Sequence, residues 1–206
     1  IDASASPAPC QDGYFSAGGA DKCSPVAPGY EVVLSSEGLR VGQSQCAAGN
    51  FSVGKSDYCS RCEAGKHQPE QGQPSCDACS SNWVAPQQGS ANCTICEAGF
   101  SCANAAAAPV PCTNGTYAST RATLCTRVEA GHSAVIIKGG GAWNRVGQQK
   151  CSEGHFSSGG LDVCSPCEAG KVQPKEGVAS CKRCDSGMFA SETGMANCSA
   201  CPQGHS

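Results

Sequence analysis

The spacing of the cysteines from Cys46 to Cys102 constrains the fold of this chain more than any other feature. Gaps of twelve or thirteen residues alternate with gaps of two, and a gap of five ends the series. A glycine or asparagine follows most first cysteines, and these residues adopt the positive-φ turn that other residues resist. We therefore predict that each long gap closes as one small looped module, and that each two-residue gap joins two modules.

Covalent cross-links must replace a large hydrophobic core in a chain of this composition. Of 206 residues, 19 are cysteine and 26 glycine, while 5% are aromatic and 15% charged, against about 25% charged in a typical domain. A loop of about fourteen residues closed by a disulfide gains roughly 3 kcal/mol in the chain-entropy model, so several loops fix the path of the chain. The predicted fold class is small, disulfide-rich and mostly irregular or β, an elongated tandem array of short disulfide-closed modules with β-hairpins.

Disulfides in this number indicate an oxidising compartment, so we expect an extracellular chain, secreted or on the cell surface. The net charge of −3 and the lack of a Lys/Arg block argue against nucleic acid as a partner. No apolar run reaches the roughly eighteen residues of a membrane span. The opening IDASASPAPC has neither the basic start nor the apolar run of a signal peptide, so we expect a mature product or an internal piece of a longer chain.

The second half of the chain repeats the first. The offset is 102 residues for the first two matched cysteines and 105 for the others, which a three-residue insertion near Gly139–Gly141 explains. We predict a Pro/Ala/Ser joint at 1–9, a first repeat copy at 10–102, an Ala/Pro joint at 103–111 and a second copy at 112–206. The matched cysteines are Cys10, Cys23, Cys46, Cys59, Cys62, Cys76, Cys79, Cys93 and Cys96 in the first copy, and Cys112, Cys125, Cys151, Cys164, Cys167, Cys181, Cys184, Cys198 and Cys201 in the second.

The odd number of cysteines has a simple interpretation. Cys102 closes the first copy, and the second copy stops at Ser206, one residue short of the matching position. We therefore expect a longer natural chain with a cysteine at the next position, as the partner of Cys201.

The repeat also bears on which cysteines pair. The two-residue rhythm would place cysteines at Val26 and Gln43, and in the second copy at Val128 and Gln148. Two cysteines are thus missing together in each copy, as members of one bridge should be. This favours sequential pairing over an interlocked scheme in which the first cysteine bonds the third and the second the fourth. The sequential pairs are Cys10–Cys23, Cys46–Cys59, Cys62–Cys76, Cys79–Cys93, Cys96–Cys102, Cys112–Cys125, Cys151–Cys164, Cys167–Cys181 and Cys184–Cys198.

The module without cysteines carries most of the β signal. YEVVLSSEGLRV at 30–41 and AVIIKGGGAWNRV at 134–146 each have two apolar or β-branched runs around a turn, which predicts hairpins. One interpretation is that their apolar residues fill a local core in place of the missing disulfide. The other is that they form an exposed assembly interface; its residues would be Val135, Ile136, Ile137 and Trp143.

The joints at 3–9 and 104–111 alternate proline with alanine and serine. This composition favours extended polyproline II, so we predict semi-rigid spacers.

Four N-glycosylation sequons begin at Asn50, Asn92, Asn114 and Asn197. Asn92 and Asn197 occupy the same place in both copies, and an extracellular location permits modification. We expect N-linked glycans, and the Ser/Ala/Pro joints are candidates for O-linked ones. An ordinary surface asparagine is the alternative at each site.

Zinc is the main chemical alternative to disulfides, because the CxxC pairs have nearly the spacing of a zinc ribbon. We expect no metal, since zinc would leave two cysteines of each copy without a CxxC partner. We also expect no enzyme and no cofactor. The histidines do not recur between copies, and small looped modules offer little of the cleft that a nucleophile and base require. The four histidines are His67, His132, His155 and His205.

Two stretches, CAAGNFSVGKSDYCSRCEAG and CSEGHFSSGGLDVCSPCEAG, resemble the ephrin-receptor-like cysteine-rich repeat. More loosely they resemble the single-bridge modules of tumour necrosis factor receptors. The resemblance departs at Val26 and Val128, where a family cysteine is missing, and at Asn82, where glycine is usual. It implies an extracellular, elongated, non-enzymatic module with nearest-neighbour disulfides, but no particular ligand.

Two functions follow as hypotheses. The repeat of about a hundred residues and the Ala/Pro joints look like a fibre-forming protein, such as those of algal flagellar hairs (mastigonemes). The chain would then be a glycosylated segment of an extracellular filament or cell-surface fibre, a stiff protease-resistant rod whose partners are copies of itself. The alternative is a receptor or adhesion ectodomain that binds another extracellular protein.

Overall fold

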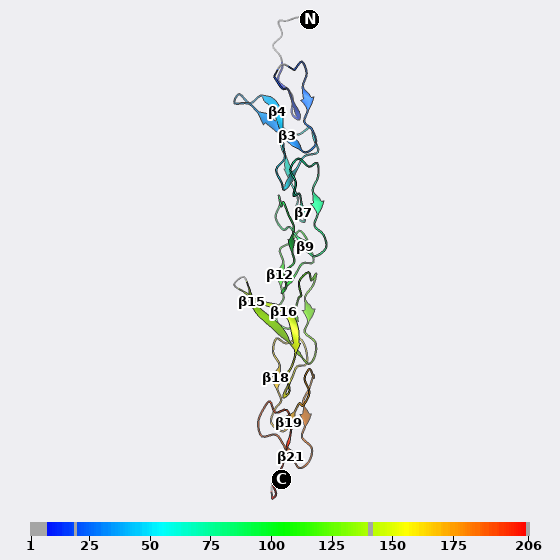
Figure 1. Cartoon of the computed structure of the whole chain (residues 1–206), viewed down its shortest axis with the longest axis vertical. Helices are drawn as coiled ribbons and strands as arrows, with labels where there is room; N and C mark the ends of the chain where they lie inside the picture. Colours follow the sequence, from blue (N-terminus) through cyan, green and yellow to red (C-terminus); the bar gives the residue numbers. More distant parts are fainter. Residues whose placement is uncertain (1–7, 19, 140–141, 205–206) are drawn as a thin grey trace. The chain divides into compact units, whose positions relative to one another are not determined.

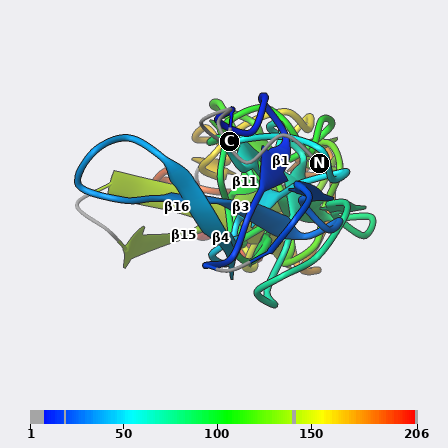
Figure 2. The same ribbon diagram turned by 90° about the horizontal axis from the view of Figure 1, so that it is seen from above.

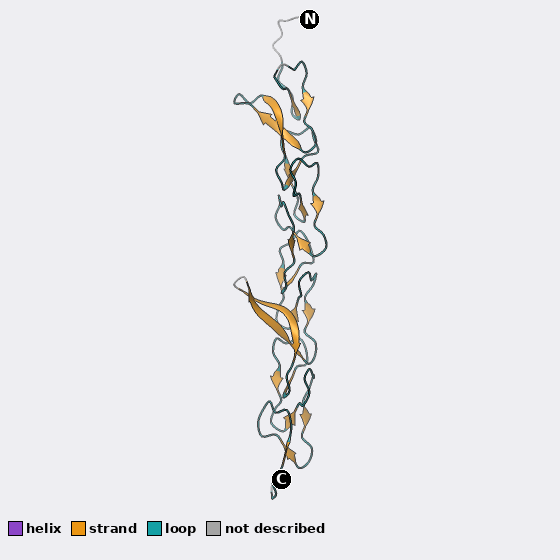
Figure 3. Ribbon diagram, in the orientation of Figure 1, coloured by secondary structure: helices purple, strands orange, loops and turns teal. Residues whose placement is uncertain are grey.

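Very short strands connected by turns make up the chain (Figure 1). The computed structural model describes residues 8–18, 20–139 and 142–204. Over these residues it contains eleven two-stranded antiparallel sheets, and the only secondary structure in colour is strand and loop (Figure 3). No helix of the described part is long and apolar enough to cross a membrane.

Nine of the sheets share one design, with two residues in each strand. The first strand follows a turn with positive φ. In eight of the nine sheets the second strand directly follows the cysteine that closes the loop, and the exception, Val110–Pro111, ends just before Cys112. The strand pairs are β1 (Tyr14–Phe15) with β2 (Ser24–Pro25), β5 (Asn50–Phe51) with β6 (Ser60–Arg61), β7 (Lys66–His67) with β8 (Asp77–Ala78), β9 (Trp83–Val84) with β10 (Thr94–Ile95), β11 (Phe100–Ser101) with β12 (Val110–Pro111), β13 (Thr116–Tyr117) with β14 (Thr126–Arg127), β17 (His155–Phe156) with β18 (Ser165–Pro166), β19 (Lys171–Val172) with β20 (Lys182–Arg183), and β21 (Met188–Phe189) with β22 (Ser199–Ala200).

Disulfides close these loops in sequential order. The structure contains nine bridges, with the sequential scheme rather than the interlocked one. Eight of them span 13 or 14 residues, and Cys96–Cys102 spans 6. Among the described residues, only Cys201 is outside a disulfide. The predicted fold class, a disulfide-rich, mostly β and irregular tandem array of short disulfide-closed modules, is confirmed.

The modules have very small interiors, and the one closed by Cys167–Cys181 is built from the disulfide and one buried polar side chain. Cys167 and Gln173 are both essentially inaccessible to solvent. The Gln173 amide nitrogen donates to the Ser180 carbonyl (2.6 Å), and its oxygen accepts from the Lys175 N–H (3.1 Å). Because both ends of the amide are satisfied, a buried glutamine organises the loop without the cost of an unpaired polar group.

Successive modules interlock through backbone hydrogen bonds. Gly154 N–H donates to the Gln173 carbonyl (2.7 Å), and Cys167 N–H donates back to the Gly154 carbonyl (2.8 Å). Gly194, one module further on, donates to the Cys167 carbonyl (2.7 Å). Gly154 has φ +76°, and a Cβ at this position would collide with the Gly194 carbonyl oxygen. Only glycine allows the backbones to approach this closely.

The two predicted hairpins are confirmed. The first hairpin pairs β3 (Tyr30–Leu34) with β4 (Arg40–Gln45), and the second pairs β15 (His132–Gly139) with β16 (Ala142–Lys150). Seen along the chain, each hairpin extends away from the loops of its own unit (Figure 2). At the tip of the first, Ser35 Oγ accepts the N–H of Leu39 (3.1 Å). Part of the predicted Gly-rich tip of the second lies outside the described residues.

A buried valine and a glutamine replace the missing bridge in each hairpin module. Val26 and Val128 are each 1% exposed. Gln43 Oε1 accepts the Ala27 N–H (2.8 Å), and Gln148 Oε1 accepts the corresponding N–H of Glu129 (2.8 Å). A hydrophobic side chain and one hydrogen bond thus occupy the place of the disulfide.

The contacts divide the chain into two compact units. Unit 1 runs to Ile95 and includes Asn104–Ala108, and unit 2 consists of Cys96–Ala103 and the chain from Pro109 onward. The prediction of an extended spacer at 104–111 is wrong. Asn104 Oδ1 accepts the Ala106 N–H (2.9 Å) in a side-chain turn, and β12 then pairs with β11. An asparagine side chain that mimics a backbone turn ends the extended conformation here.

Candidate interaction surface

A partly buried arginine–aspartate pair anchors the second hairpin to its neighbours. A bulge between Val135 and Ile136 shifts the register, and bulges commonly re-aim a side chain. Arg145 lies opposite Ile136, and its Nε and Nη2 donate to Asp162 Oδ2 at 2.8 and 2.6 Å. Arg145 Nη1 also donates to the Cys112 carbonyl (3.3 Å).

The aspartate connects to a third module. Asp162 Oδ1 accepts the Gly115 N–H (2.9 Å), so one carboxylate joins the hairpin, its own loop and the loop before the hairpin. The hydrogen bonds from Arg145 lower the pKa of Asp162 below its usual value, and the Gly115 N–H acts in the same direction, while burial opposes them. The carboxylate is therefore ionised at neutral pH.

Unit 1 contains the same arrangement, and we call each one the clamp. Arg40 Nη2 donates to Asp57 Oδ2 (2.6 Å), and Asp57 Oδ1 accepts the Gly13 N–H (2.7 Å). The first hairpin has the same bulge, between Val33 and Leu34. The pKa of Asp57 is lowered first by the hydrogen bonds from Arg40 and then by the Gly13 N–H.

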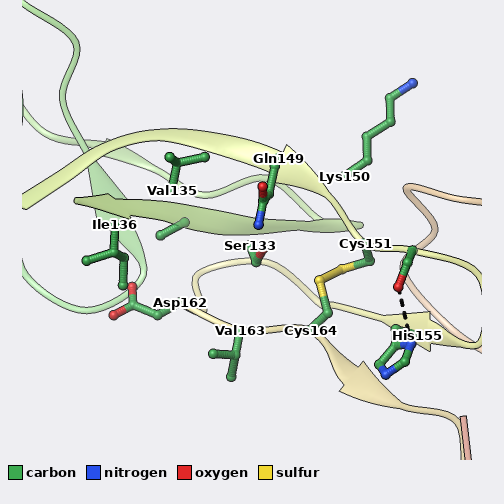
Figure 4. A pocket seen from close by; sticks show the side chains of 12 residues that line it. Ser133, Val135, Ile136, Gln149, Lys150, Cys151, His155, Asp162, Val163 and Cys164 are labelled. Carbon is green, nitrogen blue, oxygen red and sulfur yellow. Dashed lines mark hydrogen bonds between the residues drawn. A yellow bond between two sulfur atoms is a disulfide. The ribbon is translucent and has the colours of Figure 1, made fainter.

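The clamp of unit 2 lies at one end of a shallow groove of about 680 Å³ between the second hairpin and the Cys151–Cys164 loop (Figure 4). In this view Ile136 points toward Asp162, and Val163 lies next to it on the loop. Val163 is 69% exposed. The groove therefore has an apolar wall beside a charge that is already neutralised by its partner.

Unit 1 differs at the equivalent position. There Glu31 Oε2 accepts the Cys59 N–H (3.1 Å), so its side chain crosses from the first hairpin to the loop. Ser133 is the counterpart of Glu31, and it lines the groove of unit 2. A serine is too short to make the same bridge, and the space that it leaves is part of the groove.

The predicted assembly residues divide between the groove and the hairpin tip. Val135 and Ile136 are half-buried and line the groove. Ile137 is 50% and Trp143 66% exposed near the tip. Ala134 is buried, whereas Ile137 and Trp143 are open to solvent. The assembly interface therefore stays a prediction.

One segment of unit 2 matches a known family model. Residues 154–197 match the family model described as Tyrosine-protein kinase ephrin type A/B receptor-like. This ephrin-receptor-like segment supplies Asp162 and Val163, whereas the second hairpin precedes it. Among curated proteins, none matches the chain. The disulfide-rich modules and the ephrin-receptor-like segment fit an extracellular ectodomain, and the resemblance seen in the sequence is confirmed for these residues.

The sequons differ in accessibility. Asn92, Asn114 and Asn197 are exposed. Asn50 is half-buried in β5, and its amide nitrogen donates to the Ala48 carbonyl (3.3 Å). Since Asn50 is the least accessible of the four, the other three are better placed to accept a glycan.

Apart from Cys201, the CxxC cysteines of the zinc alternative bond to other cysteines, and the sulfur of a disulfide is not the thiolate that zinc requires. One cluster of potential ligands among the described residues, His67 with Cys79 and Cys93, contains both sulfurs of a single bridge.

The described histidines do not form a catalytic arrangement. His155 Nδ1 lies 3.4 Å from Ser152 Oγ, the contact dashed in Figure 4. Its other polar contact is the Glu153 carbonyl (3.1 Å). Asp162, the nearby groove carboxylate, is bound to arginine. A serine nucleophile needs a base that a third group orients, and this pair has none among the described residues. His205 lies outside them.

Sequence reasoning missed the clamp. Arg40 and Asp57 recur as Arg145 and Asp162 at the same offset of 105 residues. In a chain with so few charges, this recurrence could have pointed to the pair. However, the two partners are 17 residues apart in the sequence, so their contact does not follow from local structure. Only the bulge and the loop closure bring them together.

Proposed function

We propose that this chain is a structural repeat segment of an extracellular filament or cell-surface fibre, and that it is non-enzymatic and carries N-linked glycans at its exposed sequons. The observation that carries the proposal is the repetition of one inter-module backbone network in both copies. Gly49 N–H donates to the Gln68 carbonyl (2.7 Å) in the first copy, as Gly154 does to Gln173 in the second. A network that recurs at matching positions of both copies suits a chain whose purpose is regular continuation.

The network suggests how such a segment would resist force. Each disulfide closes its own loop, so the loop cannot be pulled out. Load passes between loops through hydrogen bonds such as Cys167 N–H to Gly154 (2.8 Å) and Gly194 N–H to Cys167 (2.7 Å). In linear repeat proteins each unit is stabilised by its neighbours, and here these bonds join each module to the modules before and after it.

We place the contacts between separate chains of the filament at the hairpin tips. Ile137 and Trp143 expose apolar surface, which in water favours association. Electron microscopy of native material purified without reducing agent tests the proposal. We expect regular filaments with an axial repeat set by one or two repeat copies. Particles that stay single at all concentrations would contradict it.

A double variant, Ile137→Asp with Trp143→Ser, tests the contact itself. Both side chains are exposed, so the variant should fold with all its disulfides and fail to assemble. Leu124→Ser is the matched control, because Leu124 is 67% exposed in the same unit but away from the hairpin. Light scattering measures assembly, and normal assembly of the double variant would exclude the tip as the contact.

The groove of unit 2 favours a second candidate, a receptor or adhesion ectodomain. A ligand-binding site normally breaks the equivalence of repeats, and Ser133 in place of Glu31 does so at the groove. Under this function the partner is an extracellular protein segment with an apolar side chain that packs on Val163 and Ile136. Specific binding by monomeric chain would favour this candidate over the filament.

A further inference from the structure

One face of unit 1 corresponds to a face that is covered in unit 2. In unit 2 the Cys96–Cys102 loop packs on the module that begins at Cys112. Gly99 N–H donates to the Ala118 carbonyl (2.8 Å), and Cys112 N–H donates to the Gly99 carbonyl (2.8 Å). The same two bonds join Gly154 to Gln173 and Cys167 further along the unit.

The second hairpin completes this contact. Gly99 has φ +90°, and a Cβ built there would lie 2.7 Å from Asn144 Cβ. The turn therefore sits directly on the hairpin next to Arg145, the arginine of the clamp. Ala118 beneath it is only 1% exposed, so the contact excludes water.

The first repeat copy has the corresponding hairpin and loop contact, but no turn equivalent to that of Gly99 covers it among the described residues. Ser16 N–H donates to the Arg40 carbonyl (3.1 Å), as Ala118 N–H does to the Arg145 carbonyl (3.0 Å). Ser16 is the counterpart of Ala118, and Leu39 is the counterpart of Asn144. Over the described residues, the Ser16 carbonyl and the Cys10 N–H have no partner.

This face is hollow and partly apolar. A cavity of about 450 Å³ lies over Cys10, Ser16, Leu39 and Val41. Leu39 is 47% and Val41 41% exposed. An acceptor carbonyl, a donor N–H and an apolar edge thus lie together, in the positions that the Gly99 turn contacts in unit 2. We call this face the socket.

We propose that the socket binds the Cys-x-x-Gly turn of a further repeat copy, joined to Cys10 as the Cys96–Cys102 loop is joined to Cys112. The turn's glycine N–H donates to the Ser16 carbonyl, and its carbonyl accepts the Cys10 N–H. Leu39 and Val41 pack against the turn. The inference rests on the proposed role as one segment of a repeat array, and it holds whether or not the hairpin tips assemble.

The test is a chimera in which residues 96–111 replace residues 1–9, so that a second Cys-x-x-Gly turn directly precedes Cys10. Amide hydrogen exchange is measured by NMR on the whole chain. The natural Gly99 in the same molecule is the positive reference. The disulfide-closed peptide 96–111, free in solution, is the unprotected reference.

The grafted glycine should exchange at least about tenfold more slowly than in the free peptide, and the resonances of Ser16, Leu39 and Val41 should shift. A graft with glycine replaced by valine is the matched control. Its Cβ would meet Leu39 in a backbone conformation that valine avoids, so protection should be lost while the disulfides remain.

Exchange of the grafted glycine at the free-peptide rate, with mass spectrometry showing the grafted disulfide closed, would overturn the proposal. Equal protection when the free peptide is added to the unaltered chain would overturn the covalent arrangement, because the socket would then accept turns from separate chains. Neither result depends on the assembly of the hairpin tips, so the filament proposal is tested separately.

Discussion

The two hairpin modules share their attachment and differ in their exposed parts. Both have the bulge, the buried valine, the glutamine hydrogen bond and the clamp. In unit 1, Glu31 bridges the hairpin to the loop, whereas in unit 2 Ser133 leaves a groove and the hairpin is longer. The residues that hold the hairpin in place are thus kept, while those that a partner would meet vary. This difference suggests that the attachment serves the array and that the exposed parts carry specificity.

The largest effect is expected from the loop beside the second hairpin. Replacing both cysteines, Cys151→Ala with Cys164→Ala, should lower the free energy of unfolding of unit 2 by about 3 kcal/mol. This loop carries Asp162, so its disorder also releases the clamp. Chemical denaturation measures the loss. The hairpin module has no bridge of its own, and an unchanged midpoint would mean that the hairpin does not depend on the neighbouring loop.

Removing the clamp charge comes next. Asp162→Asn should destabilise unit 2 by about 2 kcal/mol, because hydrogen bonds to a charged group contribute roughly 1.5–3 kcal/mol and Arg145 would stay largely buried without its partner. Glu168→Gln is the control. It removes the exposed pair with Lys171, and such pairs contribute little. Equal effects of the two substitutions on thermal unfolding would show that the clamp is only a surface pair.

The clamps also predict a pH dependence. The pKa of Asp57 and that of Asp162 lie below the ordinary 3.8. Their stabilisation is therefore complete above that value and is lost as the pH falls through the lowered pKa. Exchange protection of the Gly115 amide, corrected for the intrinsic rate, should be constant from pH 7 to 5 and fall below about pH 4.

The Asp162→Asn variant provides the control for that pH profile. With no carboxylate to titrate, the protection of its Gly115 amide should not change between pH 7 and pH 3. A profile that falls in the variant as it does in the natural chain would assign the acid sensitivity to another group.

The smallest effect concerns the groove. Ser133→Glu should close it, with the new carboxylate accepting the Cys164 N–H as Glu31 accepts that of Cys59. The reverse change, Glu31→Ser, should open a groove in unit 1 and cost about 1 kcal/mol for the lost hydrogen bond. NMR shifts of the Cys164 and Cys59 amides report both. No shift in either variant would mean that this residue does not account for the difference between the units.

The sequence determined the modular plan. The cysteine spacing determined the loop lengths, because the two ends of a fourteen-residue segment with a glycine turn lie close enough to form a disulfide. Two expected cysteines are missing together, with Val26 and Gln43 in their places, and this pointed to sequential bridges. Two apolar or β-branched runs around a turn at 30–41 and at 134–146 predicted both hairpins, since β pairing across a short turn is a local property.

The tertiary structure decided everything that depends on residues distant in the chain. Proline and alanine at 104–111 predicted a spacer, but Asn104 and the pairing of β12 with β11 fold it back. The clamp needs the bulge to turn Arg145 toward Asp162 and the disulfide loop to present that carboxylate. The groove forms only when the hairpin and the disulfide loop are both in place, because they are its two sides. Sequence alone specifies how each loop closes, because the residues involved are close together in the chain. Charge pairs and grooves between loops form only when the loops stack, because their free energy comes from contacts between distant residues.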